Sequence, residues 1–128
     1  MVLTEYLSDV TKAIDEYSRT GLILSSELKI DARTEKIGLI KGSFVFINES
    51  KLFFTEYLDL RYKIEKLAYS FHYQDKNDEL IFRYDNAAHK PGHRLKSHKH
   101  VKGAILQTEI PDLRGILKEI FSGLLSPL

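Results

Sequence analysis

The histidines of this chain are concentrated in one segment. Four of the five lie within twelve residues, at positions His89, His93, His98 and His100. Just before them, the segment ELIFRYDN alternates as a strand does, so Arg83 and Asp85 share one face at its end. Imidazole takes and gives protons near neutral pH, and a guanidinium stabilises a phosphate that gains negative charge. These are the residue types of metal-free phosphodiester cleavage.

In that chemistry a base removes the proton of the ribose 2′-hydroxyl, an acid protonates the leaving oxygen, and cations stabilise the phosphorane. Histidine suits both proton roles, because its pKa of about 6.5 in water lies close to working pH. Asp85 would orient one imidazole, as a carboxylate does in catalytic triads. The sequence therefore predicts a catalytic site built from Arg83, Asp85, His89, His98 and His100.

A cationic window surrounds the histidines. The chain has a formal net charge of +1, yet residues 86–102 contain five lysine or arginine side chains and no acid, which leaves the rest of the chain mildly acidic. A local concentration of cations on an acidic body is typical of an anion site. The predicted nucleic-acid contacts are Lys90, Arg94, Lys96, Lys99, Lys102 and Tyr84.

Most aromatic side chains are expected in the core, because a sheet packed on helices needs their apolar area and each buried ring contributes roughly 1.5–3 kcal/mol. Three tyrosines are predicted to remain on the surface, where bases can stack on them: Tyr69, Tyr73 and Tyr84. His72, on the same alternation, lies opposite the face of Phe71 and is expected to be an exposed or hydrogen-bonded strand residue.

Other interpretations stay open at this stage. Arg83 and Asp85 can form a structural ion pair, and SHKHV can be a solvated edge strand whose charges prevent aggregation. A metal is a second alternative, because the segment contains ligands that zinc or manganese accepts. These ligands are Asp85, His89, His93, His98 and His100. The five nearby cations would repel a divalent ion, so the sequence predicts no metal and no cofactor.

Length and composition bound the class of protein. With 128 residues, 43% hydrophobic and 29% charged, the chain is expected to form a single domain over residues 1–128. The absence of cysteine excludes disulfides, thiolate-bound zinc and a cysteine nucleophile. The first residues lack the features of a secretory signal, and no stretch reaches the ~18 apolar residues that cross a bilayer. A cytoplasmic protein without membrane contact is expected.

The periodicity of the apolar residues predicts an α+β fold. Spacings of three and four predict a helix over residues 3–20 and another over residues 110–125, with Pro111 at its first position. Between them, a period of two predicts five strands in ELKIDAR, IGLIKGSFVFI, KLFFTEYLDLR, IEKLAYSFHYQD and ELIFRYD, with a sixth in GAILQTE. Short connections require antiparallel neighbours. The expected architecture is a meander of five to six strands with both helices packed on it, in two layers.

Three stretches resemble the TumE family of toxins from bacterial and archaeal toxin–antitoxin modules. They are HYQDKNDELIFRYDNAAHKPGH, SHKHV and IPDLRGILKEI. In that family an FRYDNAPHH-like stretch, an HKH-like stretch and a helix opened by proline occur in this order, and this chain has Ala88 in place of the first proline. The resemblance implies a toxin that acts on cellular RNA or on another nucleic-acid-linked target, with a cognate antitoxin as its partner.

The leading functional hypothesis is the toxin of a toxin–antitoxin pair, acting as a metal-independent endoribonuclease by histidine acid–base catalysis. The alternative is a non-enzymatic module that binds nucleic acid or a protein through the same cationic segment. An exposed edge strand or an apolar sheet face would also allow a homodimer, and the sequence does not decide between monomer and dimer.

Overall fold

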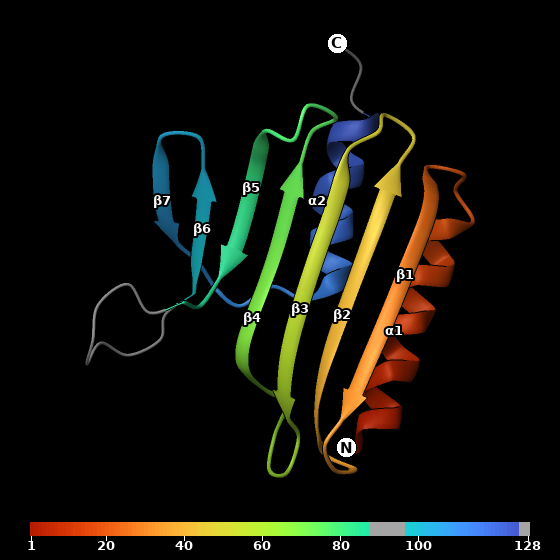
Figure 1. The fold of residues 1–128 in the computed structure, drawn as a ribbon, viewed down its shortest axis with the longest axis vertical. Coiled ribbons are helices and arrows are strands. Elements are labelled where there is room, and N and C mark those ends of the chain that lie inside the picture. The colour runs from red at the N-terminus through yellow and green to blue at the C-terminus, as the bar shows by residue number, and fades with distance from the viewer. Residues whose placement is uncertain (88–96, 126–128) are drawn as a thin grey trace.

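The structure is a computed structural model that describes residues 1–87 and 97–125. It begins with helix α1 (Leu3–Ser18) and ends with helix α2 (Leu113–Leu125). Between them lie the strands β1 (Ile23–Ala32), β2 (Ile37–Phe46), β3 (Lys51–Asp59), β4 (Glu65–Gln74), β5 (Leu80–Asp85), β6 (His98–Val101) and β7 (Ala104–Gln107). Figure 1 shows the strands side by side, with both helices behind the sheet.

The sheet is an antiparallel meander, in which the spatial order of the strands equals their order in the chain. The predicted α+β class with two terminal helices is confirmed. The predicted number of five to six strands is wrong, because the sheet has seven. The strand left out of that count is β6, which the sequence offered only as an alternative edge strand, because HKHV lacks the apolar alternation that predicts a strand. In the structure β6 is paired on both sides, with β5 and with β7. A tight turn with Gly103 at a φ of 79° joins β6 to β7.

The hydrophobic core lies between the helices and one face of the sheet. A period of two places the apolar side chains of the central strands on this face, where the apolar stripes of both helices cover them. Its most deeply buried members on the sheet are Ile40, Phe44, Phe46, Leu52, Leu58 and Phe71. In the described part of the chain no helix covers the other face, called the open face below, which is turned toward the viewer in Figure 1.

Local sequence features mark the start of α2 and the end of α1. Pro111 precedes α2, and the Asp112 carboxylate accepts a hydrogen bond of 2.7 Å from the Gly115 N–H, which caps the first turn. Gly21, with a φ of 79°, turns the chain from α1 into β1. Within residues 1–87 and 97–125, neither helix is long and apolar enough to cross a membrane.

Candidate active site on the open face of the sheet

The strand register brings together side chains that are distant in sequence. On the open face His72 of β4 lies opposite Arg83 of β5, and Arg83 lies opposite His100 of β6. The same row continues to Phe53 of β3, which is paired with His72. Directly paired residues of antiparallel strands have Cβ atoms about 4.5–5.5 Å apart. A single row across the sheet therefore holds an aromatic ring, two imidazoles and a guanidinium.

Asp85 is the centre of this group. Its Oδ2 accepts a hydrogen bond of 2.9 Å from Arg83 Nε, and its Oδ1 lies 3.3 Å from His100 Nε2. The Asp85 side chain is only 8% exposed, whereas that of Arg83 is 40% exposed. A buried carboxylate thus fixes a guanidinium whose outer part reaches solvent. Because a carboxylate accepts and does not donate, the contact also assigns a proton to His100 Nε2.

The environment of Asp85 favours its charged form. Burial alone would raise the pKa of this carboxyl group, but the hydrogen bonds from Arg83 and His100 outweigh burial and hold the pKa below its ordinary value. The Asp85 carboxylate is therefore ionised throughout the neutral range. It can orient the imidazole of His100 without taking its proton, as the carboxylate of a catalytic triad does.

We expect Asp85→Asn to make stability less dependent on pH in acid. The folded-state pKa of Asp85 is depressed, so its stabilising effect is complete above the unfolded value of about 3.9 and is lost as pH falls through the folded value. An amide does not titrate. Urea unfolding from neutral pH to about pH 2 should give a shallower decline for the variant, and a loss of about 1.5–3 kcal/mol at neutral pH. Parallel declines in the two proteins would contradict this interpretation.

His72 is a member of the group that the sequence analysis did not place in the site. Its Nδ1 lies 3.4 Å from Arg83 Nη1, and its Nε2 lies 3.1 Å from the Oε1 of Gln74. An Nε2 proton donated to Gln74 leaves Nδ1 to accept from the guanidinium. His72 therefore holds Arg83 from the side opposite Asp85. The signal was available in the sequence, because alternation places His72 outward and the short β4–β5 turn places it beside Arg83.

Asn86, which follows Asp85, has a structural task. The pairing of β3 with β4 shifts between Tyr57 and Leu58, so that Leu67 has no partner and Lys66 lies opposite Leu58. The side chain of Asn86 compensates for this bulge: its Oδ1 accepts a hydrogen bond of 3.0 Å from the Tyr69 N–H, and its Nδ2 donates one of 3.3 Å to the Leu67 carbonyl. The segment FRYDN therefore contains two residues of the candidate site, Arg83 and Asp85, and a third residue, Asn86, that hydrogen-bonds the backbone of β4.

The predicted catalytic residues are placed as follows. Arg83, Asp85 and His100 form the group described above, and His98 is paired with Asp85 in the register of β5 and β6. The rings of His98 and His100 have centroids 6.2 Å apart. His89 lies outside the described residues, as do three of the predicted nucleic-acid contacts, Lys90, Arg94 and Lys96.

Two further predicted nucleic-acid contacts lie on the other face of the sheet. Tyr84 donates a hydrogen bond of 2.7 Å to Glu119 Oε1 of α2, and Lys99 Nζ lies 3.0 Å from Glu119 Oε2. They attach β5 and β6 to α2, so we leave them out of the candidate site. Lys102 is exposed in the turn between β6 and β7.

The expected surface tyrosines are also corrected. Tyr69 and Tyr73 are buried, with 4% and 5% exposure, because they point into the core beside Phe71. The exposed ring near the site is that of Phe53, which is 43% exposed on the open face. The strand sequence KLFFTEYLDL is apolar on both faces, so alternation alone did not identify Phe53 as the outward ring.

The described residues contain no group of three or more histidine, aspartate or glutamate side chains arranged to hold a metal ion. Two ligands of the metal alternative, His89 and His93, lie outside the described residues. Within the described part, the Asp85 oxygens are occupied by Arg83 and His100 rather than directed toward a common point.

A second polar cluster lies on the helix-covered side. Glu56 is fully buried, its Oε1 accepts a hydrogen bond of 2.7 Å from the Tyr6 hydroxyl, and its Oε2 lies 2.6 Å from Lys66 Nζ. Lys66 Nζ also donates to the Pro111 carbonyl at 2.7 Å. Burial and the neighbouring Glu56 raise the pKa of Tyr6, which keeps the phenol protonated.

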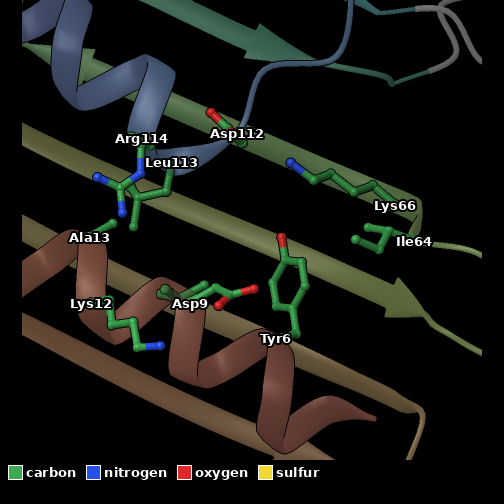
Figure 2. A pocket seen from close by; sticks show the side chains of 10 residues that line it. Tyr6, Asp9, Lys12, Ala13, Ile64, Lys66, Asp112, Leu113 and Arg114 are labelled. Carbon is green, nitrogen blue, oxygen red and sulfur yellow. The ribbon is translucent and has the colours of Figure 1, made fainter. Parts of the chain in front are cut away.

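Tyr6 and Lys66 line a pocket of about 380 Å³ between α1 and the start of α2. Figure 2 shows these two side chains reaching toward one another across it, with Asp112 on the α2 side. The Glu56 carboxylate is held by two groups of the protein: Tyr6 donates a hydrogen bond to Oε1, and the Lys66 ammonium forms an ion pair with Oε2. The cluster therefore attaches α1 and the start of α2 to the sheet, and it lies across the sheet from Arg83.

Comparison with known proteins agrees with the arrangement of these motifs. No curated protein and no solved structure matches the chain. The family model described as Toxin TumE matches residues 10–124, which include the strands, the candidate site and nearly all of α2. The chain therefore belongs to the TumE toxin family.

Proposed function

We propose that this toxin is a metal-independent endoribonuclease whose active site is the Arg83–Asp85–His100 group on the open face. One observation carries the proposal: a buried carboxylate binds both a guanidinium and an imidazole and directs them to the same solvent-exposed surface. Ribonucleolytic cleavage needs a cation for the phosphate and an oriented imidazole for proton transfer. Membership of a toxin family implies a cognate antitoxin as the partner that restrains the activity.

In the proposed reaction the scissile phosphate lies over Arg83. His100, whose Nε2 proton is held by Asp85, uses Nδ1 to remove the proton of the 2′-hydroxyl. The 2′-oxygen forms a bond to phosphorus, the bond from phosphorus to the 5′-oxygen breaks, and His98 supplies the proton to that oxygen. Arg83 stabilises the added negative charge of the phosphorane. The products are a 2′,3′-cyclic phosphate and a 5′-hydroxyl end.

His72 is a positioning residue in this scheme. It accepts from Arg83 Nη1 on the side away from Asp85, so the guanidinium plane is held between two strands. Gln74 in turn holds His72 through Nε2. A guanidinium fixed before the substrate arrives requires less reorganisation when the phosphorane forms.

Binding without catalysis is the competing function. In that case the cationic segment binds nucleic acid or a protein, and the ion pair of Arg83 with Asp85 is purely structural. The two functions differ in their products: an enzyme converts RNA to shorter pieces with defined ends, whereas a binding module returns the RNA intact.

The direct test is incubation of purified toxin with end-labelled RNA in excess EDTA. We expect cleavage to proceed, to give 2′,3′-cyclic phosphate ends, and to stop when the 2′-hydroxyls are methylated, because the proposed nucleophile is then blocked. Products that carry 5′-phosphates, or cleavage that EDTA abolishes, would contradict the mechanism. Intact RNA that remains bound to the protein would favour the binding function.

A further inference from the structure

We propose that single-stranded RNA lies across the open face of the sheet, with one base stacked on Phe53 next to the phosphate held over Arg83. The inference rests on the proposed function and adds a substrate class to it. It follows from three features of the described residues: an exposed aromatic ring, its place in one row with the candidate site, and a pair of lysines farther along the same face.

Phe53 is unusual among the phenylalanines of the sheet. The others, Phe44, Phe46, Phe54, Phe71 and Phe82, are at most 4% exposed and belong to the core. Phe53 is 43% exposed in the middle of the open face, where its ring centroid lies 6.5 Å from that of His72. Exposing a large ring there sacrifices burial energy. Aromatic rings on sheet faces serve as stacking surfaces for unpaired bases.

The register sets the distance from this ring to the candidate site. Phe53 is paired with His72, and His72 with Arg83, so two strand spacings separate the ring from the guanidinium. Neighbouring strands are about 4.8 Å apart, which gives about 10 Å between these positions. One nucleotide bridges that distance between its phosphate and its base. A base stacked on Phe53 therefore belongs to a nucleotide adjacent to the phosphate over Arg83.

The charges farther along the open face suit a polyanion. Lys29 of β1 and Lys41 of β2 are directly paired and both exposed, although like charges in opposed positions destabilise a sheet. On the same face of β1, Glu27 and Asp31 carry negative charges, and Arg33 lies 3.5 Å from Asp31. These two acids and three cations leave the group with a net charge of +1. Cations thus lie on both sides of Phe53, as a nucleic-acid backbone that crosses the strands requires.

The experiment compares binding of a short mixed-sequence RNA whose 2′-hydroxyls are all methylated, so that affinity is measured without cleavage. Phe53→Ala should weaken binding roughly 5- to 150-fold, the range of one lost stacking contact. Phe53→Trp should retain or improve affinity, since it keeps a stacking surface. The matched control is Tyr62→Ala, which removes a 92% exposed ring from the β3–β4 connection and should leave affinity unchanged. The same RNA in a duplex should bind equally to all four proteins, because its bases are already stacked.

Equal affinity of Phe53→Ala and wild type for the single strand, with unchanged melting temperatures, would overturn the inference. So would a Phe53→Ala defect confined to binding of the antitoxin or to self-association, because the face would then serve a protein partner. The outcome is separable from that of the proposed function. If Phe53→Ala loses affinity but wild type cleaves no RNA, the binding surface is retained and the endoribonuclease is rejected. If wild type cleaves RNA and Phe53→Ala changes neither cleavage nor affinity, the endoribonuclease is retained and the binding surface is rejected.

Discussion

His100→Ala should lower the rate of RNA cleavage by about 10²- to 10⁴-fold, the usual contribution of a general acid or base. The imidazole is the group that Asp85 orients, and alanine provides no proton acceptor for the 2′-hydroxyl. Binding of 2′-O-methylated RNA should persist, because the guanidinium of Arg83 remains in place. Single-turnover cleavage assays and equilibrium binding on the same protein preparations would separate the two effects.

The matched control for this variant is Ile105→Ala. Ile105 of β7 is paired with His100, is 61% exposed and offers no titratable group, so it samples the same edge of the sheet without the chemistry. In cells, expression of wild type should slow growth, while expression of His100→Ala or His98→Ala should not. Equal toxicity of the folded variants and wild type would reject the catalytic assignment of the histidines.

Lys66→Ala should destabilise the protein by about 3–5 kcal/mol, the cost of leaving a buried charge without its partner. Glu56 is fully buried, and Lys66 Nζ lies 2.6 Å from its Oε2. Lys66 also attaches the Pro111 carbonyl before α2. The free energy of unfolding in urea measures the loss, and a fraction of the variant should already be unfolded at neutral pH.

Lys63→Ala provides the control, because Lys63 is an exposed lysine in the β3–β4 connection, three residues before Lys66, and its loss should change stability by less than about 0.5 kcal/mol. The combination Glu56→Gln with Lys66→Met removes both charges together and should be markedly more stable than Lys66→Ala alone. If the single and double variants are equally unstable, the lost contacts are those of the lysine stem rather than those of the ion pair.

The strands β2 to β5 were predictable because a period of two runs through most of each sequence, although it did not settle which rings of β3 and β4 face outward. That alternation placed Arg83 and Asp85 on one face, and the structure adds that His100 shares it. Alternation could not identify His100 as the partner of Asp85. The sequence of β6 has too few apolar residues to predict a strand, and its register depends on pairing with β5.

Lys66 illustrates why alternation fails at the other cluster. Counting outward from Phe71 by twos assigns Leu67 to the core and Lys66 to the open face. The bulge at Leu67 reverses this assignment, so that Lys66 points inward and Leu67 is 39% exposed. A bulge depends on pairing between two strands and on the Asn86 side chain that satisfies the freed backbone groups. Neither is visible in the sequence of one strand.

The order of the strands has a consequence for synthesis of the toxin. Each strand pairs only with its predecessor and successor, so every ladder closes a short loop and can form as soon as the next strand emerges. The helix that seals the core arrives last: α2 brings Ile116, Leu117 and Ile120 onto a face whose strands are already complete. A chain interrupted before Leu113 therefore exposes the apolar face of the sheet that α2 would cover. Chaperones and proteases that recognise exposed apolar surface would act on such an incomplete chain before an active toxin forms.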